Sequence, residues 1–138
     1  LYVEDHARGI DLVLNEGKVG HTYNIGGDNE KTNIDIVTTI CQLIDLRFVQ
    51  NESLLSAYPD CPAAKNTPCA SLITYVKDRA GHDFRYAIDT TKIRTELGYE
   101  PGIDFNSGIA KAVDWYLNNA PWWRSVLDGS YRDSKNKG

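Results

Sequence analysis

The stretch YVKDRAGHDFRYAID, residues 75–89, decides how the rest of the chain is interpreted. Tyr75 and Val76 open it in the manner of a strand, and its last residue, an aspartate, is placed to start a helix. Five ionisable side chains surround one glycine between these ends: Asp78, Arg79, His82, Asp83 and Arg85. A solvated turn needs only one or two polar residues and a glycine. Two arginines and a histidine in one loop therefore indicate that an anion binds here.

Length and charge limit the classes of function. The chain has 138 residues, which suits one domain with a single core. Hydrophobic residues make up 41% and charged residues 25%, as in ordinary globular proteins. The net charge of -4 argues against a nucleic-acid partner, so an anion must be held by a local cluster of arginines. No apolar run approaches the roughly 18 residues that span a membrane, so no membrane partner is expected.

The three cysteines are typical of a reduced protein, and we expect a cytoplasmic location. Cys41 falls on the apolar side of a predicted helix and is interpreted as a small buried hydrophobe. Cys61 and Cys69 share one segment and could pair under oxidation. They lack the second pair of ligands that a zinc site needs, so no metal is expected.

Apolar spacing predicts two helices downstream of the opening stretch. Asp89 is expected to cap a short helix that Gly98 ends, with Ile93 and Leu97 facing inward. Residues 104–119 have apolar side chains four apart and predict the last helix. Residues 121–126 are expected to extend or cap it.

Upstream, residues 3–14 also have helical spacing, and a glycine at position 17 is expected to stop the helix. Residues 32–46 predict a second helix, whose Thr32 and Asp35 have the spacing of a capping box. Its apolar stripe predicts that this helix is well buried. Short strands are predicted at residues 21–27 and 71–76.

Residues 47–70 contain three prolines, two cysteines and little periodicity. They are interpreted as a loop insertion within a domain of residues 1–128, and as the least ordered internal segment. Residues 129–138 are predicted to be a polar tail. The expected fold class is α/β, mostly helical with a few short strands, without the regular alternation of a complete doubly wound domain. The chain has no methionine, even at residue 1, and we expect a piece of a longer protein.

Other motifs carry less weight. The fingerprint G-x-G-x-x-G, the P-loop and the Gly-x-Ser-x-Gly elbow are absent from the sequence. The pair Gly26 and Gly27 is interpreted as a turn between a strand and a helix. The run Glu4-Asp5-His6 could be an acid–base or metal cluster. However, the helix dipole favours acids at such a position without any ligand.

Asn33 and the loop of residues 78–82 remain as candidate sites. Asn33 lies in the first turn of a predicted helix, where it can bond a phosphate or carbonyl oxygen or be a plain first-turn residue. Arg79 can hold two phosphate oxygens, Gly81 allows a close backbone approach, and His82 can donate to an oxygen. A solvated, salt-bridged loop is the alternative interpretation.

Six stretches resemble the carboxy-terminal part of the dTDP-glucose 4,6-dehydratases, which are extended short-chain dehydrogenase/reductases acting on nucleotide sugars. They are LYVEDHARGIDLVL, GKVGHTYNIGG, NEKTNIDIVTTICQLID, LITYVKDRAGHDFRYAID, KIRTELGYEP and FNSGIAKAVDWYLNNAPWW. Together they cover nearly the whole chain except residues 47–70 and the tail. Related epimerases and decarboxylases share loose forms of YVEDHA and YNIGG. The pattern DRxGHDxRYAID followed by WYLxNxxWW is far more specific to the dehydratases.

The resemblance implies roles for six residues. Asn33 matches an asparagine that binds the nucleotide part of the substrate. The loop Asp78, Arg79, Ala80, Gly81 and His82 matches a family loop, usually Asp-Arg-Pro-Gly-His, that also contacts the nucleotide, with the arginine on the phosphates. Alanine in place of the usual proline frees φ and makes the loop less rigid. The implied ligand is dTDP-glucose or a related nucleotide sugar.

The resemblance also implies NAD, held by an amino-terminal Rossmann domain in the complete family members, which are homodimers. We expect that domain to be absent from this chain, because the glycine fingerprint is missing. Neither NAD binding nor catalytic residues are therefore expected here. Two alternatives stay open: a piece of a related epimerase or decarboxylase, and a non-catalytic nucleotide-binding module.

Overall fold

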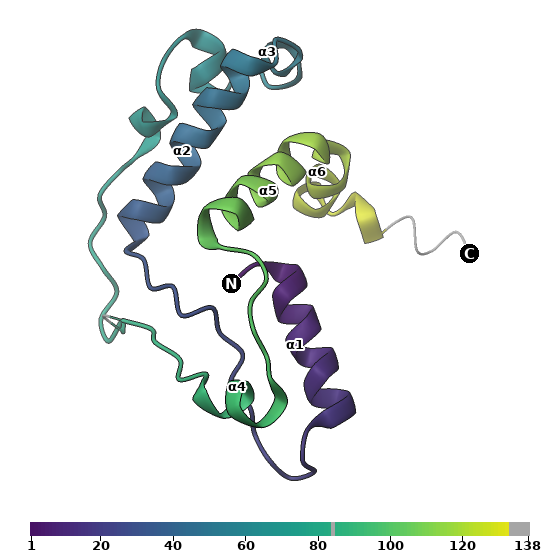
Figure 1. Cartoon of the computed structure of the whole chain (residues 1–138). Helices are drawn as coiled ribbons and strands as arrows, with labels where there is room; N and C mark the ends of the chain where they lie inside the picture. The colour runs from purple at the N-terminus through teal and green to yellow at the C-terminus, as the bar shows by residue number, and fades with distance from the viewer. Residues whose placement is uncertain (84, 133–138) are drawn as a thin grey trace.

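The computed structural model describes residues 1–83 and 85–132 (Figure 1). These residues form α-helices and short 3-10 helices (η) in the following order: α1 (Val3–Glu16), α2 (Asn33–Gln50), α3 (Ser53–Ala57), η1 (Pro62–Lys65), η2 (Cys69–Leu72), α4 (Thr91–Leu97), α5 (Phe105–Asn118) and α6 (Ala120–Asp128). Long extended connections join the helices. Residues 133–138 of the predicted polar tail lie outside the described part of the chain.

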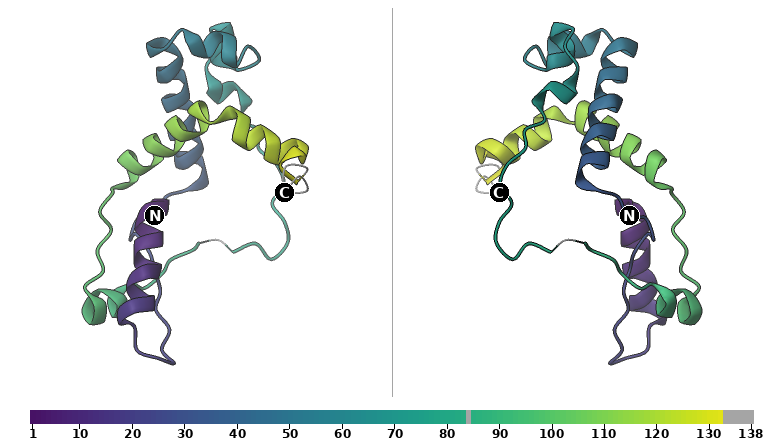
Figure 2. Two further views of the ribbon diagram at one scale, coloured as in Figure 1. Left: turned by 90° about the vertical axis from the view of Figure 1, so that its right-hand side faces the viewer. Right: turned by 90° about the vertical axis from the view of Figure 1, so that its left-hand side faces the viewer.

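The helices form two groups (Figures 1 and 2). In the upper group of Figure 1, α2 packs against α5, and α3, η1 and η2 fold back onto α2. In the lower group, α1 packs against α4. Each group has a small core, made of Phe48, Leu54, Cys69 and Val113 above and of Ile93 and Tyr99 below.

The expected short strands do not form in the described residues, so the observed architecture is helical rather than α/β. Residues 21–27 and 73–79 form no regular secondary structure, because a strand also needs a neighbour for its backbone hydrogen bonds. Side chains connect the extended segments instead. Asn24 donates to the carbonyl of Asp89 at 3.1 Å, and Thr90 donates to the Asp28 carboxylate at 2.9 Å.

The prediction of an unstructured loop at residues 47–70 is wrong. This segment contains the end of α2, then α3, η1 and the start of η2. Leu54 and Cys69 are 7% and 3% exposed, so the segment buries side chains that the lack of periodicity concealed. Whether these residues are an insertion stays a prediction.

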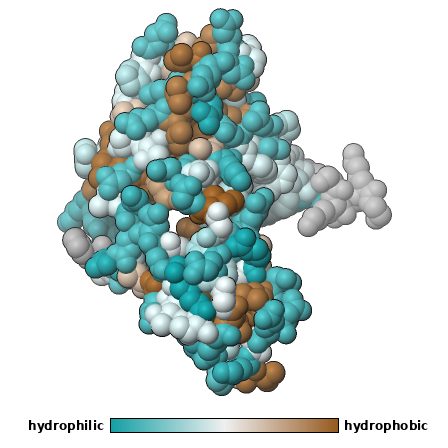
Figure 3. All heavy atoms as spheres, viewed as in Figure 1, coloured by the Kyte–Doolittle hydropathy of each residue, from teal (hydrophilic) through white to brown (hydrophobic). Residues whose placement is uncertain are grey.

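The prediction that α2 is well buried is also wrong, because its neighbours cover only one side. Ile34 and Val37 are each 41% exposed, and only Phe48 of this helix is buried. Cys41 is half-buried, and burial raises the pKa of its thiol. Apolar side chains of α1 face solvent as well, since Leu14 is 80% exposed. Hydrophobic side chains accordingly reach the surface over α2 and around α1 (Figure 3).

Asp5 is a structural carboxylate rather than part of an acid–base or metal cluster. Its buried side chain accepts hydrogen bonds from the backbone N–H groups of Gly102 and Ile103, each at 2.9 Å. Arg8 lies 3.0 Å from the same carboxylate. The Gly102 hydrogen bond outweighs burial and holds the pKa of Asp5 below its usual range. In the described residues, no group of three potential metal ligands is close enough to hold an ion.

The predicted helix ends are largely confirmed. The Thr32 hydroxyl caps α2 by accepting from the Asp35 N–H at 3.2 Å. It also donates to the Asp35 carboxylate at 2.6 Å, so the Asp35 side chain bonds the threonine side chain instead of the backbone N–H that a full capping box uses. At the start of α4 the N-cap residue is Thr90 and not the predicted Asp89, although the Asp89 carboxylate accepts from the Thr91 N–H at 2.9 Å. Gly98 ends that helix with φ of 65°. Among the described residues, no helix combines the length and apolarity that a membrane crossing requires.

Candidate functional site

The charged residues Asp78, Arg79, His82, Asp83 and Arg85 lie on an extended arm, which we define as residues 73–83 and 85–88. The arm runs from η2 to α4 and stands away from the helices (Figure 2). All of its described residues except Ile73 are exposed. Without a neighbouring strand, the arm has few backbone hydrogen bonds and offers its side chains to solvent.

A tight turn at residues 79–82 forms the centre of the arm. The His82 N–H donates to the Arg79 carbonyl at 3.4 Å, which closes a four-residue turn. Gly81 occupies the third position with φ of +72°, a backbone conformation that side chains disfavour. Ala80 occupies the second position, where proline is common in turns that need glycine third. The local fold therefore explains why a proline and a glycine suit these two positions.

Asp78 holds the turn together. Its Oδ1 accepts from the Arg79 backbone N–H at 2.8 Å and from His82 Nδ1 at 2.7 Å. The His82 hydrogen bond, followed by the backbone hydrogen bond, lowers the pKa of Asp78. Because one ring nitrogen of His82 is used in this way, only Nε2 remains for a ligand.

The Arg79 side chain has no hydrogen bond or ion pair with any residue that the structure describes. Asp78 and Asp83 are the acids nearest to Arg79 in sequence, and Asp78 is bound to His82 instead. The alternative interpretation, in which Arg79 is neutralised by Asp78 or Asp83, is thus not the observed arrangement. An exposed guanidinium presents its full set of donors to an approaching anion.

Asn33 is the first residue of α2 and is exposed. No direct contact joins it to the turn in the described part of the chain. The link between the two segments is an ion pair between Glu30, three residues before Asn33, and Arg85, three residues after His82. Sequence reasoning counted Arg85 only as one of several charges, and nothing in its local pattern pointed to Glu30.

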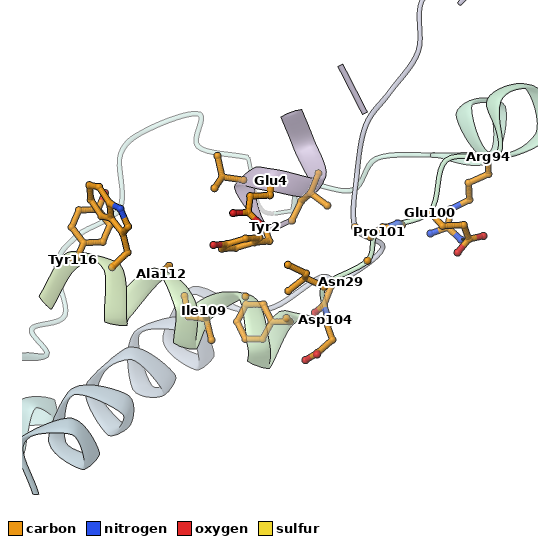
Figure 4. A pocket seen from close by; sticks show the side chains of 18 of the residues that line it. Tyr2, Glu4, Asn29, Arg94, Glu100, Pro101, Asp104, Ile109, Ala112 and Tyr116 are labelled. Carbon is orange, nitrogen blue, oxygen red and sulfur yellow. The ribbon is translucent and has the colours of Figure 1, made fainter. Parts of the chain in front are cut away.

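A large cavity lies elsewhere, between α1, α5 and the segment before α5 (Figure 4). It has a volume of about 1040 Å³, with Tyr116 at one end and Arg94 with Glu100 at the other. Its charged side chains are the three acids Glu4, Glu100 and Asp104 and the single cation Arg94. Arg94 is already paired with Asp28 at 2.7 Å. This balance repels a diphosphate, so the cavity is a poor anion site.

Comparison with known proteins shows what the chain is similar to. Residues 1–112 match the sequence profile of the GDP-mannose 4,6 dehydratase family. The dTDP-glucose 4,6-dehydratase of Neisseria meningitidis serogroup B is 50% identical over 132 residues, and that of Salmonella typhimurium is 51% identical. Each match covers 96% of this chain but only 34% and 32% of the relative. The chain thus spans about a third of the length of these relatives, and it matches their carboxy-terminal third.

Two solved structures agree with the sequence matches. The dTDP-glucose 4,6-dehydratase from Bacillus anthracis, in complex with NAD, superposes with a TM-score of 0.69 and 37% identity over 91% of this chain and 33% of that one. The dTDP-glucose 4,6-dehydratase from Streptomyces venezuelae, with NAD and TYD bound, gives 0.66 and 36% over 87% and 30%. The helices described above therefore have counterparts in enzymes about three times longer.

Proposed function

We propose that the chain, which belongs to the GDP-mannose 4,6 dehydratase family, is the nucleotide-sugar-binding part of a dTDP-glucose 4,6-dehydratase. The reaction converts dTDP-glucose to dTDP-4-keto-6-deoxyglucose and water. The observation that supports this role best is the exposed Arg79 guanidinium, held on a turn whose neighbouring acid is occupied by His82. Among the described residues, no acid pairs with the cation that the turn presents, which suits a diphosphate.

Each residue of the proposed site has a distinct task. Arg79 binds two phosphate oxygens of the diphosphate at once. Gly81 gives the backbone the conformation of the turn, and Asp78 orients His82 so that Nε2 can donate to a ligand oxygen. Asn33 hydrogen bonds the nucleotide from the start of α2, where unpaired backbone N–H groups also favour an anion. Binding energy from the nucleotide then positions the sugar for chemistry performed by other groups.

NAD is proposed to bind outside this chain, in the complete enzyme. The sequence lacks the glycine fingerprint, and the described residues contain no strand leading into a glycine-rich helix start. When bound in the complete enzyme, NAD would supply the hydride-transfer chemistry. One Tyr-x-x-x-Lys spacing does occur, from Tyr131 to Lys135, but it follows the last helix and Lys135 lies outside the described residues. We therefore assign no catalytic role to this chain.

The exposed apolar surfaces suit a longer, homodimeric enzyme. Leu14 of α1 and Trp122 of α6 are 80% and 57% exposed, and the acidic cavity is lined largely by apolar side chains. We propose that other parts of the enzyme cover these surfaces, and that the enzyme acts in the cytoplasm. The isolated 138-residue chain should then form no 4-keto-6-deoxy product even with added NAD. Detectable product would contradict the proposed division of labour.

The proposal is tested by substitution of Arg79 in the complete enzyme. A charge-assisted hydrogen bond contributes roughly 1.5 to 3 kcal/mol, so Arg79→Ala should raise KM about ten- to a hundredfold. Arg79 should bind the substrate equally well in the ground state and in the transition state. Its loss should therefore change kcat less than KM. Arg79→Lys should not restore binding, since an ammonium cannot reproduce the planar two-oxygen contact. Arg132→Ala removes the same charge outside the arm and serves as the control.

An unchanged KM in both Arg79 variants would contradict the proposal and support the alternative interpretation, in which the arm is a solvated loop without a ligand. The base preference is tested by thermal shifts with dTDP, UDP and GDP. A larger shift with dTDP supports a dTDP-sugar enzyme, and a larger shift with UDP or GDP points to a related epimerase or dehydratase of another nucleotide sugar.

A further inference from the structure

Two cysteine thiols face each other beside α2, in the segment that leads into the arm. The sulfur atoms of Cys61 and Cys69 lie 3.7 Å apart, and both thiols are free. A disulfide has an S–S length of about 2.05 Å, so only a small approach separates the pair from a covalent bond. Cys41, the third cysteine, lies on α2 and takes no part in this contact.

Three elements hold the two thiols in place. Cys61 immediately precedes η1, and Asn66 follows η1 in a left-handed conformation with φ of 56°, which turns the chain back. Cys69 begins η2, and its backbone N–H donates to both carboxylate oxygens of Asp45 on α2, at 3.0 and 3.3 Å. The approach of the two sulfur atoms is therefore part of the packing of η1 and η2 on α2.

We propose that Cys61 and Cys69 form a reversible dithiol–disulfide site that reacts with low-molecular-weight disulfides of the glutathione type. A Cys61 thiolate attacks the reagent, forms a mixed disulfide and releases one thiolate. Cys69 then loses its proton and attacks the Cys61 sulfur, which closes the bond between the two cysteines and releases the second thiolate. The protein loses two protons and two electrons, and the reagent gains both as two thiols.

The environment sets the order of attack. Cys69 is 3% exposed, whereas Cys61 is only half-buried. Burial, with the neighbouring Asp45 carboxylate, raises the pKa of the Cys69 thiol to about 12. A buried thiol that resists ionisation reacts slowly with a reagent in solution. Cys61 therefore meets the reagent first, and Cys69 acts as the resolving thiol.

The bond would fix the segment from which the arm starts. The η2 helix begins at Cys69 and ends at Leu72, and the arm begins at the next residue. A bond between Cys61 and Cys69 restrains η2, where the arm starts, and makes no contact with the charged turn. Such a pair in a reducing compartment is typical of a transient, redox-responsive bond rather than a permanent one.

The test exposes the full chain to glutathione buffers, from fully reduced to fully oxidised, and then alkylates the remaining thiols. Peptide mass spectrometry should show that Cys61 and Cys69 lose their labels together, as one linked peptide without bound glutathione. When the oxidised chain is unfolded and alkylated, Cys41 should still carry the alkyl label. Treatment with dithiothreitol before alkylation should restore labelling of both Cys61 and Cys69. Glutathione retained on Cys61 in the oxidised wild-type chain, or a bond that includes Cys41, would overturn the proposal.

Serine variants separate the two steps. Cys41→Ser should behave as the wild type and is the matched control. Cys69→Ser should stop at a stable glutathione adduct on Cys61, and Cys61→Ser should leave Cys69 largely reduced. Equal glutathione adducts on both single variants would contradict the assigned order. The wild-type peptide map decides the main proposal even where a variant does not fold.

Discussion

Residues 47–72 and the arm are consecutive, yet the first segment folds onto α2 and the second stands away from the helices (Figure 2). From the sequence, the first is a proline-rich loop and the second begins as a strand. In the structure the first segment is helical, and the described residues of the arm form no strand. A helical turn satisfies its backbone hydrogen bonds within a few residues, so α3, η1 and η2 form despite the prolines. A strand depends on a neighbour, and in the described residues the arm has none.

The difference also separates stability from binding. The first segment buries Leu54 and Cys69. The arm exposes Arg79 and His82, with only a turn to hold them. Substitutions in the first segment should therefore change the free energy of unfolding, and substitutions in the arm should change ligand binding.

The largest expected effect compares two apolar side chains. Leu54 is 7% exposed and Val76 is 83% exposed. Leu54→Ala removes buried methyl groups and should lower the free energy of unfolding by roughly 2 to 4 kcal/mol. Val76→Ala should change it by no more than about 0.5 kcal/mol. Urea unfolding of both variants measures the difference, and equal losses would contradict the contrast between the segments.

A medium effect concerns two carboxylates with lowered pKa values. Arg47 Nε and Nη2 donate to the Asp114 carboxylate at 2.5 and 2.9 Å, and this hydrogen bonding lowers the pKa of Asp114. The pair joins α2 to α5. A carboxylate with a lowered folded-state pKa stabilises the fold above its unfolded pKa of about 3.9, and this contribution disappears as the pH falls through the folded-state value.

Asp114 is partly exposed, so its contribution is about 1 kcal/mol after solvent screening. Asp114→Asn should remove this amount near pH 7 and much less near pH 2, as measured by urea unfolding at both values. Asp78 also has a lowered pKa, but it is exposed in the arm. Asp78→Asn should leave unfolding almost unchanged at either pH. A matching loss for Asp78→Asn would mean that the turn is part of the folded core.

The smallest effect tests the turn itself. Ala80 occupies the position where proline fits, and no described residue accepts a hydrogen bond from its backbone N–H. Ala80→Pro should therefore fold normally and restrict the unbound loop. The expected gain is about 0.4 to 1 kcal/mol, or roughly two- to fivefold tighter dTDP binding by calorimetry. Weaker binding would show that the turn must change shape to accept the nucleotide. Gly81→Ala is the opposite control, because a side chain strains the positive φ.

The sequence supports accurate prediction where the cause is local. The cap of Thr32 on Asp35 N–H, the stop at Gly98 and the inward face of Ile93 depend on neighbouring residues, and all of them form. Contacts between distant residues were missed, among them the ion pair of Glu30 with Arg85.

Burial was also misjudged, for the same physical reason. Periodicity shows which face of a helix is apolar, but it does not show what covers that face. The stripe of α2 is apolar and yet partly exposed, because its neighbours pack on one side only. Asp5 shows the reverse case, a charged residue whose burial depends on N–H groups almost a hundred residues away.

We propose that the arm, and not the large cavity, binds the nucleotide diphosphate. Amide hydrogen exchange of the complete enzyme with and without dTDP tests this claim most directly. We predict that dTDP slows exchange at residues 78–82 and at the start of α2, while Ile109 and Ala112 at the cavity exchange at unchanged rates. Slower exchange at the cavity residues, with none in the arm, would contradict the assignment.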